Sequence, residues 1–159
     1  MRKIFIIFGL ASLLLSACGD SNNNGNGQVN NSSFPKVSKP YRPEQAVQNG
    51  DVVNVHGKYS NMDKWHQFIK NIEAEKEDKV RITQYTIEGD PIFYELVYDG
   101  KTIHYTYDNS MDAFGSDAGR PSASCKVIGT DKNEQGHEYY VLNECNNDIG
   151  KSFWFAKEE

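Results

Sequence analysis

The stretch VRITQYTIEGDPIFYELVYDGKTIHYTYD, residues 80–108, decides the fold. It is rich in β-branched and aromatic residues, and the turn-forming sequences EGDP (88–91) and DG (99–100) divide it into strand-length pieces. Asp-Gly is a favoured pair for a two-residue type I′ turn, which fixes the register of the hairpin around it. We therefore predict an antiparallel hairpin within a β-sheet.

The predicted register gathers apolar side chains on one face of this hairpin. With Tyr98 opposite Lys101, the apolar cross-strand pairs on that face are Leu96–Ile103, Tyr94–Tyr105 and Ile92–Tyr107. The other face is mixed and places Glu95 opposite His104. We interpret this pair as a surface ion pair, with an acid/base pair as the alternative.

Two helices are predicted before the hairpin. Residues 43–50 begin with proline and end with glycine, a pattern typical of a short helix, and residues 51–56 follow as a short strand. The second helix takes Ser60 or Asn61 as its cap. Its apolar residues recur every three or four positions: Met62, Trp65, Phe68, Ile69 and Ile72.

Three further strands are predicted after the hairpin, at residues 124–130, 137–143 and 152–156. Together these segments indicate an α+β fold, with two helices packed on an antiparallel sheet of about five to six strands. Residues 41–159 are long enough for one domain with one core.

The N-terminus has the layout of a secretory signal peptide, which we assign to residues 1–17. Arg2 and Lys3 precede a run of 12 apolar or small residues, shorter than the roughly 20 that a membrane-spanning helix needs. The sequence Leu-Ser-Ala-Cys at 15–18 resembles the bacterial lipobox, in which the cysteine thiol is acylated and becomes the new N-terminus. We predict that acyl chains on Cys18 hold the protein at the outer face of the cell membrane.

Residues 19–40 are rich in Asn, Gly and Ser, so we predict a polar tether that spans about 25 Å on average by a random-coil law of ~5–6 Å × √n. Removal of the signal peptide changes the formal charge from −5 to −7, because Arg2 and Lys3 are lost with it. An acidic surface of this kind disfavours nucleic acid as a partner.

Cys125 and Cys145 remain once Cys18 is assigned to the lipid. Cys125 lies near the start of one predicted strand and Cys145 near the end of the next antiparallel strand, so in an exported domain we predict a disulfide between them across that hairpin. Free thiols are the alternative. The chain has no C-x-x-C sequence and its four histidines are scattered, so we predict no zinc site, no other metal and no cofactor.

Six residues are candidates for ligand binding: Glu88, Asp90, Glu95, His104, Asp108 and Asp112. The first four also allow a hydrolase that works through paired carboxylates. Asp108, Ser110 and Asp112 begin like a calcium-binding loop, but Ala113 replaces the glycine that such a loop requires. An irregular oxygen-ligand site at Asp108, Asp112 and Asp117 is the alternative. Turn formation explains these aspartates better than calcium does.

Three segments carry a family resemblance: EQAVQNGDVVN (44–54), YTIEGDPIFYELVYDG (85–100) and YDNSMDAFG (107–115). They resemble a family of small lipoproteins of Gram-positive bacteria that is classed as a domain of unknown function. The likeness covers most of residues 43–145. It implies an exported, membrane-tethered domain, and it implies no activity or catalytic residue.

These observations favour a non-catalytic extracellular module that binds an unidentified ligand or protein and contacts the membrane through its lipid. The alternatives from other classes are the surface hydrolase and an inhibitor or immunity-like protein that presents the loop at 108–121. No catalytic motif of a known hydrolase class occurs in the sequence.

Overall fold

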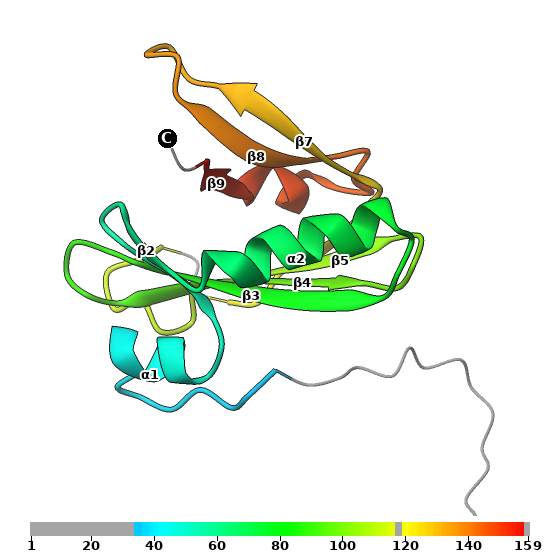
Figure 1. The fold of residues 1–159 in the computed structure, drawn as a ribbon. Helices are drawn as coiled ribbons and strands as arrows, with labels where there is room; N and C mark the ends of the chain where they lie inside the picture. Colours follow the sequence, from blue (N-terminus) through cyan, green and yellow to red (C-terminus); the bar gives the residue numbers. More distant parts are fainter. Residues whose placement is uncertain (1–33, 117–118, 158–159) are drawn as a thin grey trace, which may run out of the picture. The chain divides into compact units, whose positions relative to one another are not determined.

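A computed structural model of the chain describes residues 34–116 and 119–157 (Figure 1). The elements of its first part are α1 (Pro43–Gln48), β1 (Val52–Val55), β2 (Lys58–Ser60), α2 (Met62–Glu73), β3 (Asp78–Tyr85), β4 (Pro91–Tyr98), β5 (Ile103–Asp108) and β6 (Ser122–Cys125). Then follow β7 (Val127–Lys132), β8 (Glu138–Asn143), the 3-10 helix η1 (Asp148–Ser152) and β9 (Trp154–Ala156). The predicted signal peptide, Cys18 and Asp117 lie outside the described residues.

The strands form two sheets, with orders β2-β1-β3-β4-β5-β6 and β7-β8-β9. The α+β assignment holds, but the prediction of one antiparallel sheet is wrong, because β1 and β3 pair in parallel. Parallel neighbours need a crossover connection, and here the chain crosses through β2 and α2. The predicted strand at 124–130 is divided at Lys126 between β6 and β7, and the last strand begins at Trp154.

The β4–β5 hairpin forms as predicted, but its register differs by two residues. Tyr98 pairs with Ile103, and the two-residue loop is Gly100–Lys101. The Asp99 carboxylate accepts hydrogen bonds from the backbone N–H groups of Lys101 (2.9 Å) and Thr102 (2.7 Å). Gly100 has φ +90°, which suits the first central position of a type II′ turn.

Helix α2 begins directly after Asn61, one of the two predicted cap residues. Asn61 has a left-handed backbone conformation, and no side chain caps the helix. Its amide instead donates to the carbonyls of Val47 (3.0 Å) and Asp51 (2.8 Å), which joins the helix to the α1–β1 connection. None of the described helices is long and apolar enough to cross a membrane.

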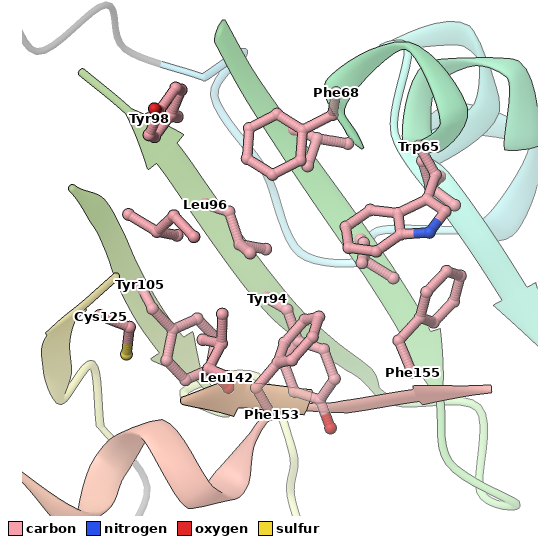
Figure 2. Packing of buried hydrophobic residues seen from close by; sticks show 14 of the residues in the cluster. Trp65, Phe68, Tyr94, Leu96, Tyr98, Tyr105, Cys125, Leu142, Phe153 and Phe155 are labelled. Carbon is pink, nitrogen blue, oxygen red and sulfur yellow. The ribbon is translucent and has the colours of Figure 1, made fainter. Parts of the chain in front are cut away.

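The main core lies on one face of the six-stranded sheet, beneath α2 and the β7–β9 sheet (Figures 1 and 2). Trp65 and Phe68 of α2 are fully buried in it, as the helical pattern predicts. The Trp65 ring lies 5.4 Å from the Phe155 ring and 4.9 Å from the Tyr140 ring, so aromatic contacts attach the second sheet to the helix.

The opposite face of the sheet is covered by α1 and by the segment that precedes it. Tyr41, Ala46, Val53, Tyr85 and Phe93 form a second apolar cluster there. Residues 34–40, assigned to the tether from their composition, lie against this face: the Phe34 ring is 5.5 Å from the Arg81 guanidinium, and Val37 packs against the cluster. The contacts of the domain thus begin at least seven residues before position 41.

A disulfide joins Cys125 and Cys145, as predicted. The two cysteines do not face each other across one hairpin: Cys125 ends β6 of the large sheet, and Cys145 follows β8 of the small sheet. Any side chain at Gly150 would overlap the Cys145 sulfur, so glycine lets η1 lie directly on the bridge. The disulfide therefore links the two sheets covalently.

Candidate functional site

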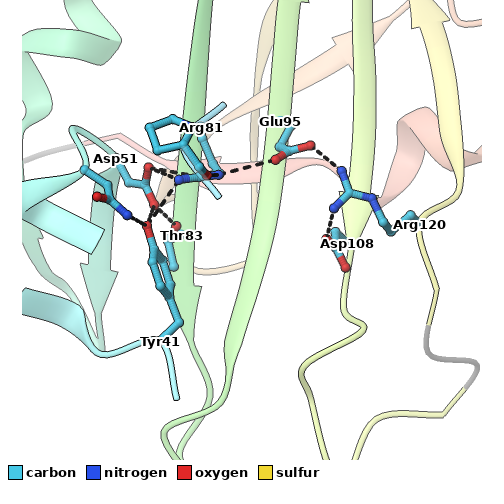
Figure 3. A network of polar contacts seen from close by, with 9 residues as sticks. Tyr41, Asp51, Arg81, Thr83, Glu95, Asp108 and Arg120 are labelled. Carbon is cyan, nitrogen blue, oxygen red and sulfur yellow. Dashed lines mark hydrogen bonds and ion pairs between the residues drawn. The ribbon is translucent and has the colours of Figure 1, made fainter. Parts of the chain in front are cut away.

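A buried ion pair lies at the centre of the α1-covered face. Arg81 of β3 donates through Nε to Asp51 Oδ1 at 2.9 Å, and each of the two side chains is only 2% exposed (Figure 3). Arg81 also donates to the Pro35 carbonyl at 2.9 Å. The pair thus holds the segment before α1 against the sheet.

Hydroxyl groups complete the hydrogen bonding of Asp51. Tyr41 and Thr83 each donate to Asp51 Oδ2 at 2.8 Å. Burial raises the pKa of the Tyr41 hydroxyl, so this group stays protonated and able to donate. A buried carboxylate with this many donors is stable in place, and it leaves little acceptor capacity for a ligand.

A second guanidinium extends the network across β4 and β5. Arg120 donates to Glu95 Oε2 at 2.7 Å and to Asp108 Oδ2 at 2.6 Å (Figure 3). Asp108 is 2% exposed, whereas Arg120 is 53% exposed. Glu95 also lies 3.6 Å from Arg81 Nη1. The candidates Glu95 and Asp108 are therefore brought together, but as partners of the same arginine.

Asp90 and Asp112 organise the loop that follows β5. Asp90 Oδ2 accepts from the Ala113 N–H at 2.9 Å, and Asp112 Oδ1 accepts from Phe114 and Gly115. Across residues 34–116 and 119–157, no group of three or more His, Cys, Asp or Glu side chains is placed to hold a metal ion. The exposed Glu88 lies in the β3–β4 turn, away from these bonds.

The predicted Glu95–His104 pair does not form, because the register shift places Thr106 opposite Glu95 and Val97 opposite His104. The His104 ring instead lies 3.0 Å from Asp99 Oδ2 through Nε2 and 3.4 Å from Ser124 Oγ through Nδ1. Hydrogen bonding to His104 lowers the pKa of the Asp99 carboxyl.

The Asp99–His104–Ser124 chain contains the residue types of a serine hydrolase. The backbone N–H of its serine, however, is not free to bind an oxyanion. The Ser124 N–H is engaged by the Asn146 side chain at 2.9 Å, so it cannot stabilise an oxyanion. His104 is 40% exposed and Asp99 30% exposed. The arrangement connects the β4–β5 turn to β6 at the surface, and we interpret it as structural.

Comparison of the sequence with known protein families shows the family of this chain. The model of a domain of unknown function, DUF4362, matches residues 49–140. The chain belongs to this family. No curated protein and no solved structure matches it. The DUF4362 match contains both ion-paired arginines with their carboxylates, and it ends inside β8, before η1 and β9.

The β7–β9 sheet of this DUF4362 protein exposes a set of side chains that the sequence reading missed. Its outward positions are Val127, Gly129, Asp131, Tyr139, Val141, Asn143, Trp154 and Ala156. We call them the outer sheet face. Trp154 is 52% exposed. Strand alternation is the signal that could have found it, since Phe155 is buried and its neighbour must point to the other face.

Large apolar side chains are also exposed on two adjoining loops. Ile87 in the β3–β4 turn is 88% exposed, and Phe114 in the loop after β5 is 79% exposed. The hydrogen bond between Asp90 and the Ala113 N–H joins these two loops. The described surface thus presents apolar groups at two places, the outer sheet face and this pair of loops.

Proposed function

We propose that this DUF4362 protein is a non-catalytic binding module held at the outer face of the cell membrane by acyl chains on Cys18. The signal-like residues 1–17, the lipobox-like Leu-Ser-Ala-Cys sequence and the polar residues after it support export and anchoring. The organism class suggested by the resemblance, Gram-positive bacteria, has one membrane with a wall outside it. The domain then faces wall polymers and secreted proteins.

One observation carries the binding role: four of the five candidate carboxylates are engaged within the protein, whereas large apolar side chains face outward. Glu95 and Asp108 share Arg120, and Asp90 binds a backbone N–H. Trp154, in contrast, exposes about half of its surface on a strand. Exposed aromatic side chains on rigid elements are typical of recognition surfaces.

Fractionation and capture test this proposal together. Cells that produce the full chain or its Cys18→Ser variant are separated into membrane and soluble fractions, and each protein is then incubated with purified wall fragments and secreted peptides. We expect the parent protein in the membrane fraction, the variant in the soluble fraction, and retention of ligand by both. Membrane retention of the variant contradicts the anchor, and a broad screen without any retained ligand contradicts the binding role.

An inhibitor-like protein is the second candidate, and the exposure of Phe114 and Ile87 favours it. Two apolar tips on adjoining loops can enter a cleft of a partner protein. Capture from a secreted-protein mixture by the parent chain, and its loss in the Phe114→Ala and Ile87→Ala variants, supports this candidate. Equal capture by parent and variants contradicts it.

A further inference from the structure

The outer sheet face differs from the two exposed loops because its exposed aromatic residue, Trp154, lies in a strand of a sheet. Trp154 pairs with Val141 across β8 and β9, while its neighbours Phe153 and Phe155 are buried to 1% and 0% exposure. The backbone of Trp154 is therefore fixed by packing beneath it. An exposed ring in such a strand needs little ordering when it binds.

Tyr139 fixes the orientation of the indole. The two ring centroids lie 5.5 Å apart with an interplanar angle of 68°, an edge-to-face contact. The Tyr139 hydroxyl accepts a hydrogen bond from Asn133 Nδ2 at 3.1 Å, so the tyrosine is held at both its ring and its hydroxyl. The pair thus forms a pre-organised aromatic platform.

The far side of the same face carries a glycine and an amide. Gly129 lies across β8 from Trp154, and a side chain at Gly129 would overlap Asn143 Nδ2. The Asn143 amide therefore lies over the glycine. No described residue forms a hydrogen bond with this amide, so it offers both a donor and an acceptor to a ligand.

We propose that the outer sheet face binds an uncharged glycan, with one pyranose ring stacked on Trp154 and a neighbouring sugar bonded to the Asn143 amide. This inference rests on the proposed binding function and names its ligand class. The C–H groups on one face of a pyranose match the apolar indole surface, and the ring hydroxyls match an amide. Tyrosine and tryptophan supply such contact area at low entropic cost.

Size and charge favour this occupant over a protein or an anionic polymer. Strands about 4.8 Å apart and a three-residue β9 give the apolar part of the face an area of roughly 10 Å by 10 Å. A stable protein partner covers about 800 Å² on each side. Asp131 is the single charged residue among the eight outward positions, and the chain is acidic overall, so a neutral ligand fits best.

Tryptophan fluorescence gives a specific test. The chain has two tryptophans, and Trp65 is fully buried, so Trp154 reports on the outer sheet face. The full chain in detergent is titrated with β-1,4-linked tetramers of glucose and of N-acetylglucosamine. We expect a blue shift and protection from acrylamide quenching with at least one tetramer.

Calorimetry of single-residue variants shows whether binding depends on the Trp154 ring or on the fold as a whole. Trp154→Ala is expected to weaken binding at least about tenfold, and Asn143→Ala to weaken it less. Lys151→Met removes an exposed side chain outside the face and is expected to bind as the parent does. Circular dichroism and the melting temperature show whether each variant is folded.

Several results overturn the inference. These are equal affinity of folded Trp154→Ala and parent, no response to either tetramer, a response to choline alone, or concentration-dependent dimers that Trp154→Ala abolishes. If wall fragments are still captured by Trp154→Ala, the binding module stands and only the glycan site falls. If neither protein captures anything, the proposed function itself falls.

Discussion

Arg81 and Asp51 form an ion pair in which both side chains are 98% removed from solvent, although 30 residues separate them along the chain. The pair lies where β3, the start of β1 and the segment before α1 meet. It shows how a stretch that reads as tether becomes part of the domain, because Arg81 also holds the Pro35 carbonyl.

Replacing Arg81 with methionine is expected to lower the free energy of unfolding by about 3–5 kcal/mol, because it leaves the buried Asp51 carboxylate without its counter-charge. Urea denaturation of parent and variant measures the difference. Lys151→Met is the matched control, since its pair with Asp148 is almost fully exposed. Equal midpoints for the two variants would contradict the assigned role of the buried pair.

Much of the hairpin could be predicted from sequence, and its register could not. Apolar alternation has a period of two, so a shift of two residues keeps every side chain on the same face. The choice between the two registers depends on whether Asp99 lies in the turn or bonds to the N–H groups after it. Composition does not reveal that local competition.

The Arg81–Asp51 pair was missed for a different reason. Arg81 alternates with Val80 and Ile82, so a strand reading places its side chain on a face expected to be in solvent. That face is buried because β1 pairs in parallel with β3 and α1 folds back over it. The segment before α1 contains three apolar residues that indicate this contact, Phe34, Val37 and Tyr41. They were overlooked because the composition of residues 19–40 is mostly polar.

Alkaline solution is expected to destabilise the fold through its core tyrosines. Burial raises the pKa of Tyr94 and Tyr105 above the ordinary value of 10.0, so the unfolded chain loses these protons first. The stabilisation that comes from these raised pKa values is fully present below pH 10.0. It is lost as the pH rises toward the pKa values of the two tyrosines in the folded protein. Melting temperatures at pH 8 to 11, with tyrosinate absorbance, check this; a constant melting temperature above pH 10 would refute it.

Reduction of the Cys125–Cys145 bond is expected to lower stability by roughly 3 kcal/mol in the chain-entropy model, because the two cysteines lie 20 residues apart. Denaturation with and without dithiothreitol measures the change, and Cys125→Ala/Cys145→Ala serves as the control that reductant leaves unaffected. A parent protein whose intact mass and stability do not respond to reductant has no such bond.

The His104–Asp99 contact predicts a titration that can be followed by NMR. Hydrogen bonding to His104 holds the pKa of Asp99 below its ordinary 3.8. In His104→Ala the Asp99 pKa should rise toward that value, because the main cause of the shift is gone. An unchanged Asp99 pKa would mean that the backbone N–H groups of the turn are sufficient by themselves.

For the outer sheet face, the alternation of side chains along a strand predicts that some aromatic residues are exposed, but not which ones. Adjacent aromatics at 153–155 and at 139–140 must point to opposite faces of a strand, so one member of each set was bound to lie outside the core. Which member faces out depends on which side of the small sheet packs on α2. This depends on tertiary packing, which places Phe155 against Trp65 of α2.

The claim on which the account depends is that lipid on Cys18 holds this domain at the cell exterior, and mass spectrometry of the N-terminal peptide tests it most directly. We expect the mature chain to begin at Cys18 and to carry a diacylglycerol thioether with further acylation where the cell supplies it. A mature N-terminus at another residue, or an unmodified Cys18 in membrane-bound protein, would contradict the account.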